Sequence, residues 1–265
     1  MREEEAINLL IYPFLACVLL ILIHVYFGIH ILERGIIFVD LSLAQFIGLG
    51  IAVSFFFGEG ITERYIFSAL FAILGASILS LNRYIARLIN IEAFIGVLYI
   101  FSLSSSILIL DRTPHGLEEF KAILNGNILW VTPGEVFSTF VIYSIIGIFH
   151  FIFRKQFFYL LSEGRGNILW EFLFFLTFAA VLVKSVQIAG ILQVFSFLVI
   201  PVLIGRLYTR NITTILISGW LIGLIMSILG MTLSYKFDLP TAPLIVASLS
   251  ILLFILLLIK FASRE

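Results

Sequence analysis

The sequence has little charge and almost no cysteine. Charged residues make up 12% of the 265 residues, about half the share of a soluble domain, so the chain lacks the charge to cover a water-exposed surface. Lys and Arg (16) balance Asp and Glu (16), without the basic excess that is typical of nucleic-acid binding. The single cysteine, Cys17, excludes an internal disulfide and a CxxC zinc site. Neither a GxxxxGKS/T phosphate loop nor an HExxH motif occurs, so we expect no enzymatic activity in the chain itself.

Long apolar runs take the place of that charge. The chain is 62% apolar, and a helix needs about 20 apolar residues to cross a bilayer. Continuous apolar blocks do not match the alternating pattern of membrane barrels. We therefore predict an all-α polytopic transmembrane bundle of eight or nine helices, with residues 1–265 as a single membrane domain. The candidate spans are 6–32, 35–58, 65–82, 93–110, 136–153, 168–183, 185–205, 211–235 and 239–259. The sixth is the weakest, because Lys184 interrupts it early.

The distribution of Lys and Arg predicts the orientation. With the N-terminus outside and nine crossings, most of these cations lie in inner loops, which is the bias of membrane proteins. The acidic start at Met1–Glu5 does not resemble a secretory signal, so the first run is predicted to be a retained span. The cations assigned to the inside are Arg34, Arg83, Arg87, Arg154, Lys155, Arg165, Arg206, Arg210, Lys260 and Arg264.

Asp40 interrupts the second apolar run. A charge at the middle of a membrane costs about 2.5–3.5 kcal/mol or more, and such a residue is usually functional. One interpretation places Asp40 on a polar translocation path, with Ser42 and Gln45 on the same stretch. The other pairs it with Arg34 near the inner interface or makes it a helix cap. On a helix Asp40 and Gln45 lie about 140° apart, so they do not share a face.

Other polar residues give weaker signals. The four histidines, His24, His30, His115 and His150, are scattered and do not predict a metal site. We expect Lys184 and Gln187 at the outer interface, and Gln193 as a hydrogen-bonding contact between helices. Pro201 predicts a kink in its span.

The connector of residues 154–166 is short, basic and amphipathic, and the orientation places it on the inner face. It is either a plain positive-inside loop or a docking helix for a cytosolic partner. The residues assigned to that docking role are Arg154, Lys155, Phe157, Phe158, Glu163 and Arg165.

Four blocks in order carry a resemblance to a known family. They are residues 30–45 (HILERGIIFVDLSLAQ), 124–129 (LNGNIL), 186–201 (VQIAGILQVFSFLVIP) and 230–242 (GMTLSYKFDLPTA). Together they resemble the permease subunits of the zinc, manganese and iron class of ABC transporters. The resemblance implies a type II importer-like fold and a permease homodimer in a prokaryotic inner or plasma membrane. It also implies cytosolic ATPase subunits, which hydrolyse ATP and dock on the 154–166 connector, and an extracytoplasmic solute-binding protein.

The sequence departs from that family where the metal is expected. The family's aspartate and histidine pair aligns with Val39 and Leu43, and Asp40 is shifted by one residue, about 100° of helix. The connector also lacks the family's Asp-Pro-Glu. The chain thus resembles a divergent branch in which Asp40 and Gln45 replace the pair. Such oxygen ligands bind hard divalent cations, and they also hydrogen-bond a metal chelate or an organic solute.

We therefore predict the permease subunit of an ATP-driven ABC transporter for a divalent metal ion or metal complex, with Asp40 as the candidate metal contact. No covalently bound cofactor is expected, because the metal is cargo. The alternatives are an ion-coupled secondary carrier, in which Asp40 serves the coupling ion, and a membrane scaffold that acts without an ATPase.

Overall fold

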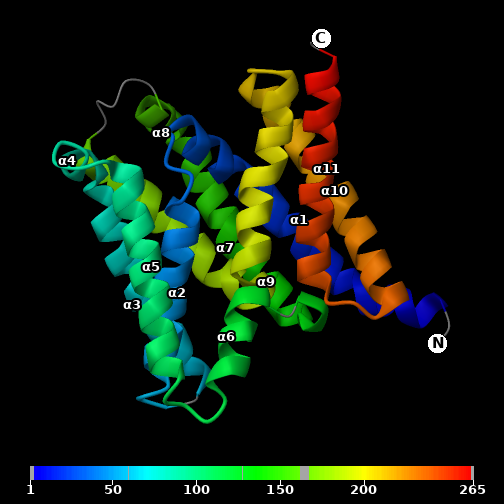
Figure 1. Cartoon of the computed structure of the whole chain (residues 1–265), viewed down its shortest axis with the longest axis horizontal. Helices are drawn as coiled ribbons and strands as arrows, with labels where there is room; N and C mark the ends of the chain where they lie inside the picture. Colours follow the sequence, from blue (N-terminus) through cyan, green and yellow to red (C-terminus); the bar gives the residue numbers. More distant parts are fainter. Residues whose placement is uncertain (1–2, 59, 127, 162–166, 264–265) are drawn as a thin grey trace. The chain divides into compact units, whose positions relative to one another are not determined.

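The computed structural model describes residues 3–58, 60–126, 128–161 and 167–263, and these residues form helices without any strand. The predicted all-α bundle is therefore confirmed (Figure 1). The elements are α1 (Glu3–Glu33), α2 (Val39–Ser54), α3 (Ile61–Ser80), α4 (Asn82–Ile85), α5 (Ile91–Leu110), α6 (Gly116–Asn125), the 3₁₀ turn η1 (Ile128–Trp130), α7 (Pro133–Ile152), α8 (Arg154–Leu161), α9 (Ile168–Tyr208), α10 (Ile212–Phe237) and α11 (Thr241–Ala262).

Polar side chains define where several of these helices begin. The side chain of Asn90 accepts a hydrogen bond from the third residue of α5, and Asn211 does the same for α10. Before α7, the backbone N–H of Thr132 donates to the Glu135 carboxylate at 2.8 Å, and the Glu135 N–H donates back to the Thr132 hydroxyl at 3.3 Å. These contacts satisfy backbone donors that a helix start leaves unpaired, and they fix the ends of the apolar segments.

The described residues contain seven helices that are long and apolar enough to cross a membrane, and α2 is a shorter apolar helix of 16 residues. The longest, α9, has 41 residues. A straight helix of that length would be about 60 Å long, twice the roughly 30 Å core of a bilayer. It covers both the sixth and the seventh predicted spans, so the prediction of eight or nine helices depends only on how α9 is counted.

The break in α9 lies at Gly190 and not at Lys184, where the sequence placed it. Gly190 has φ 73° and ψ 166°, a conformation that glycine alone adopts without strain. Lys184 is buried inside the helix, and its ammonium donates to the Tyr65 hydroxyl at 3.4 Å. The protein therefore covers the charged end of Lys184, and its expected place at the outer interface stays a prediction. The kink at Pro201 stays a prediction, since the non-helical backbone angles of α9 are those of Gly190.

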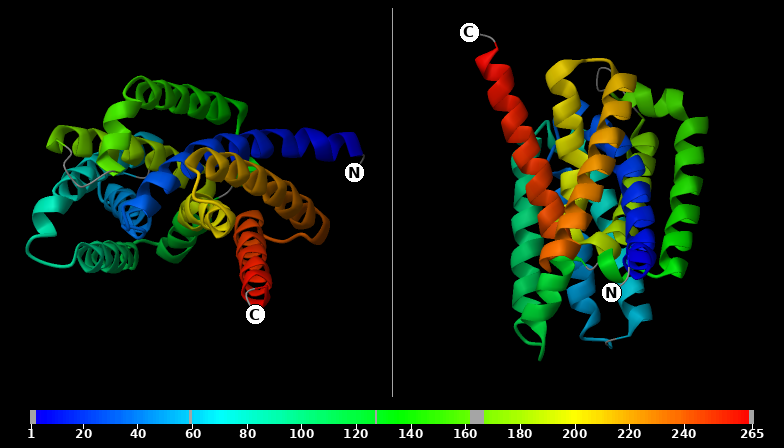
Figure 2. Two further views of the ribbon diagram at one scale, coloured as in Figure 1. Left: turned by 90° about the horizontal axis from the view of Figure 1, so that it is seen from above. Right: turned by 90° about the vertical axis from the view of Figure 1, so that its right-hand side faces the viewer.

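The chain divides into two compact units, each assembled from segments that are distant in sequence. The first comprises Met1–His30, Asn125–Tyr143 and Ile188–Glu265, and the second comprises Ile31–Leu124 and Ser144–Gln187. The single membrane domain stays a prediction. In the second unit, α2 packs against both α3 and α5 (Figure 1). In the first, α10 and α11 form a contacting pair joined by a short connection, which can be followed from two further sides in Figure 2.

Candidate functional site

Asp40 lies in the first turn of α2 and is completely buried, at 0% exposure. Within the described residues, neither of its carboxylate oxygens has a hydrogen-bond partner. The guanidinium of Arg34 contacts Glu171 instead, and the residue before α2, Phe38, provides no side-chain cap. The interpretation of Asp40 as an ion pair with Arg34 or as a helix cap is therefore wrong, and a buried, unpartnered carboxylate remains.

Ser42 and Gln45 are also buried, each at 2% exposure. Ser42 lines a small cavity together with Leu43, Gly75 and Leu98, on the side of α2 that packs against α3 and α5. Asp40 and Ser42 lie about 200° apart around a helix, and Asp40 and Gln45 about 140°. The structure thus places the three residues on one helix but not on one face, and their shared role on a path stays a prediction.

Two features of the surroundings of Asp40 act in opposite directions on its negative charge. The first turn of a helix stabilises negative charge through the helix dipole, while burial without a partner is costly. The described residues contain no group of three or more His, Cys, Asp or Glu side chains that could hold a metal. Asp40 therefore offers a single carboxylate, which leaves most coordination positions to water or to a chelating molecule.

A buried group of charges, which we call the Arg34–Glu171–Arg83 triad, lies elsewhere in the same unit. One oxygen of the Glu171 carboxylate, Oε2, lies 2.5 Å from a guanidinium nitrogen of Arg34. The other, Oε1, lies 2.6 Å from a guanidinium nitrogen of Arg83. The side chain of Glu171 is 1% exposed, against 10% for Arg34 and 25% for Arg83. Burial lowers the pKa of the Arg34 guanidinium, and the negative charge of Glu171 opposes that shift.

The triad joins the turn between α1 and α2, the short helix α4 and the first turn of α9. Both arginines were predicted to lie in inner loops, whereas no role was predicted for Glu171. A signal was present, because Glu163 and Glu171 are the only acidic residues between Glu135 and Asp238. An acid at the start of a long apolar helix, on the side predicted to hold most cations, indicates an ion pair.

The predicted docking connector forms the helix α8, with one buried and one exposed side. Phe157 is fully buried. Its ring stacks on the His150 imidazole, with centroids 3.9 Å apart, and meets the Trp170 ring edge-on at 5.6 Å. Arg154, Lys155 and Phe158 are exposed on the other side of the helix. Glu163 and Arg165, which were assigned to the same role, lie outside the described residues.

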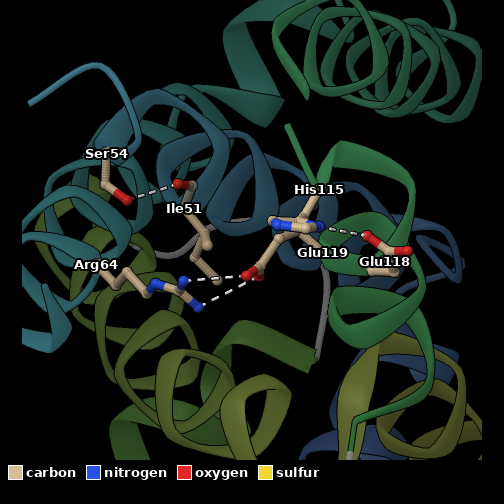
Figure 3. A network of polar contacts seen from close by, with 6 residues as sticks. All are labelled: Ile51, Ser54, Arg64, His115, Glu118 and Glu119. Carbon is tan, nitrogen blue, oxygen red and sulfur yellow. Dashed lines mark hydrogen bonds and ion pairs between the residues drawn. The ribbon is translucent and has the colours of Figure 1, made fainter. Parts of the chain in front are cut away.

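At the other end of this unit, polar contacts connect α3 and α6 (Figure 3). Arg64 donates to both carboxylate oxygens of Glu119, at 3.1 and 3.3 Å. His115 and Glu118 form a second, exposed pair at 3.2 Å. These pairs are more exposed than the Arg34–Glu171–Arg83 triad, so water screens them.

Three of the four sequence blocks meet in the first unit. A cavity is lined by Asn125, Gly126, Ile128, Leu129, Pro240, Thr241, Ala242 and Pro243, which belong to the second and fourth blocks. The backbone of Gly126 contacts that of Ala189 and Gly190, in the third block, so closely that a Cβ atom would overlap it. Gln193 donates to the Cys17 sulfur at 3.7 Å, in agreement with its expected role between helices.

A bundle of apolar helices with a broken long helix is the architecture expected of a membrane transport permease. The chain belongs to the ABC 3 transport family, whose model matches residues 6–260. The predicted family is thereby confirmed.

Curated relatives cover most of the chain. It is 24% identical over 245 residues to the manganese transport system membrane protein MntC of Listeria monocytogenes, covering 90% of this chain and 85% of the relative. It is 24% identical to a probable iron transport system membrane protein of Haemophilus influenzae, covering 85% and 80%. A membrane protein of Cyanophora paradoxa is 30% identical, covering 79% and 72%.

Two solved structures share the fold. PsaBC from Streptococcus pneumoniae, in complex with Fab, has a TM-score of 0.76 at 21% identity, covering 94% of this chain and 90% of the other. A metal-chelate type ABC transporter in an inward-facing conformation has a TM-score of 0.73 at 16% identity, covering 93% and 84%. These likenesses support the type II importer-like architecture.

Proposed function

We propose that the chain is the permease subunit of an ATP-driven importer for a divalent metal ion (zinc, manganese or iron) or a metal complex. The observation that carries this proposal is the buried, unpartnered carboxylate of Asp40 in the first turn of α2. The family supplies the transporter class, and relatives named for manganese and iron transport support the cargo.

Asp40 is suited to a cargo that stays only briefly. A carboxylate oxygen is a preferred ligand of hard divalent cations, and an approaching cation would compensate the buried charge. Because no second carboxylate or imidazole completes a site within the described residues, the ion would keep water or chelator ligands. Weak binding of this kind allows release after each cycle.

The family match supports the proposed assembly. Two copies of the chain pair in a prokaryotic inner or plasma membrane, with the N-terminus outside and the C-terminus in the cytoplasm. Two ABC ATPase subunits hydrolyse ATP below, and an extracytoplasmic solute-binding protein delivers the cargo. We assign ATPase docking to the exposed face of α8, where Arg154, Lys155 and Phe158 lie, and anchoring of that helix to Phe157.

The test is co-expression of the chain with an ABC ATPase from the same genome, followed by reconstitution. We expect a stable membrane complex with Mn²⁺-, Zn²⁺- or Fe²⁺-dependent uptake and ATP hydrolysis. Asp40→Asn should reduce uptake at least tenfold without loss of assembly, and the matched control Asp111→Asn, at an exposed acid, should not.

Two results would overturn the proposal. Uptake by the purified chain alone, driven by an ion gradient, would favour the secondary carrier, and the absence of both a complex and uptake would favour the scaffold. Normal uptake by Asp40→Asn would remove Asp40 from the path while leaving the transporter class in place.

A further inference from the structure

The Arg34–Glu171–Arg83 triad is not suited to binding the cargo. Both oxygens of Glu171 face guanidinium groups, at 2.5 and 2.6 Å. Two fixed cations around one carboxylate repel a divalent cation. The triad therefore serves another purpose than metal binding.

Stability alone does not explain the triad either. Removing charges from water costs about as much as their attraction returns, and well-packed apolar side chains often do as well. A buried acid in a membrane helix is for this reason a functional candidate. An ion triad differs from apolar packing because it fixes the geometry of its members. Charged hydrogen-bonding groups tolerate little displacement of their partners.

On one side, the triad is connected to α8 through aromatic rings. The Phe157 ring of α8 lies 6.3 Å from the Phe174 ring of α9. The guanidinium carbon of Arg34 lies over that Phe174 ring at 5.3 Å and over the Phe175 ring at 5.1 Å. A displacement of α8 therefore acts on Arg34 through packed rings.

On the other side, the triad is connected to α2 through a short, hydrogen-bonded turn. Arg34 lies in the turn before α2. In this turn the backbone N–H of Ile36 donates to the carbonyl of Ile31 at 3.4 Å, and that of Val39 donates to the carbonyl of Ile36 at 3.1 Å. Asp40 follows in the first turn of the helix. Hydrogen bonds therefore hold the backbone between Arg34 and Asp40, so a displacement of Arg34 also displaces Asp40.

We propose that Glu171 is a positioning residue that holds α8, the start of α9, α4 and the start of α2 together, so that motion of α8 moves Asp40. This inference rests on the proposed function, in which ATPase subunits act on α8. A rigid connection of this kind transmits a displacement because its parts keep one arrangement.

The experiment measures cargo-stimulated ATP hydrolysis and Mn²⁺ uptake by the reconstituted complex. For Glu171→Gln, which keeps the size of the side chain but removes its charge, we expect assembly with the ATPase. The number of ions transported per ATP hydrolysed should fall at least fivefold. The matched control is Glu119→Gln, the same change in the more exposed pair with Arg64, and it should keep the wild-type ratio.

A second variant separates coupling from folding. The triple change Arg34→Met, Glu171→Met and Arg83→Met removes all the charges together, so it leaves no charge buried alone. We expect this variant to assemble and to be uncoupled as well.

A wild-type ratio in Glu171→Gln or in the assembled triple variant would overturn the inference, and failure of both to assemble would reduce the triad to a structural role. The proposed function is judged separately, on the wild-type complex. If that complex shows no cargo-stimulated ATP hydrolysis, the proposed function fails before any variant is compared.

Discussion

Two buried acids of the same unit, Asp40 and Glu171, have opposite surroundings. Both are almost without exposure to solvent, at 0% and 1%, and both lie in the first turn of an apolar helix. Glu171 has two arginines within 2.6 Å, whereas the oxygens of Asp40 have no partner among the described residues. An ion-paired charge fixes structure, and an unpaired one is available to a ligand.

The largest expected effect is on Glu171. Glu171→Ala leaves two partly buried guanidinium groups without their counter-ion, which typically costs about 3–5 kcal/mol. We expect a clear drop in the thermal unfolding temperature of the detergent-purified chain. A melting temperature equal to that of the wild type would show that the two guanidinium groups do not need Glu171 as a counter-ion.

The effect of Asp40→Asn on stability should have the opposite sign. An amide is less costly to bury than an unpartnered carboxylate, so we expect the free energy of unfolding to rise by about 1–2 kcal/mol. The same thermal assay measures it. Destabilisation by Asp40→Asn would mean that the carboxylate has a partner in the folded protein, and the contrast with Glu171 would be lost.

Glu119→Gln should have the smallest effect. The Arg64–Glu119 pair is 33% and 26% exposed, and such surface pairs contribute about 0–1 kcal/mol, less at high salt. Thermal unfolding at low and high ionic strength measures this contribution. A loss as large as that of Glu171→Ala would show that burial does not decide the strength of these pairs.

Most of the fold was predictable, because apolar runs of about 20 residues leave few alternatives to membrane helices. The break in α9 was predicted at Lys184 because a charged residue interrupts an apolar run. The helix instead breaks at Gly190, where φ is positive. Lys184 is held by Tyr65, 119 positions away, and local sequence does not contain that contact.

The sequence predicted one of the two buried acids of the candidate site, Asp40, and missed the other, Glu171. Asp40 was found because a charge within an apolar run is conspicuous, but the sequence left open whether Arg34 pairs with it. Glu171 was missed because its two partners come from other parts of the chain, at Arg34 and Arg83. The amphipathic connector was predicted from its pattern, while the burial of Phe157 between His150 and Trp170 required the folded arrangement.

The contact of Gly126 with Ala189 and Gly190 has a consequence for mutational tolerance. Gly126 has φ 62°, and any Cβ atom there would overlap the backbone opposite. No side chain is small enough to fit, so chemical similarity offers no substitute at this position. In a scan of all substitutions, Gly126 should therefore reject every amino acid alike, alanine included, whereas exposed positions nearby should accept many.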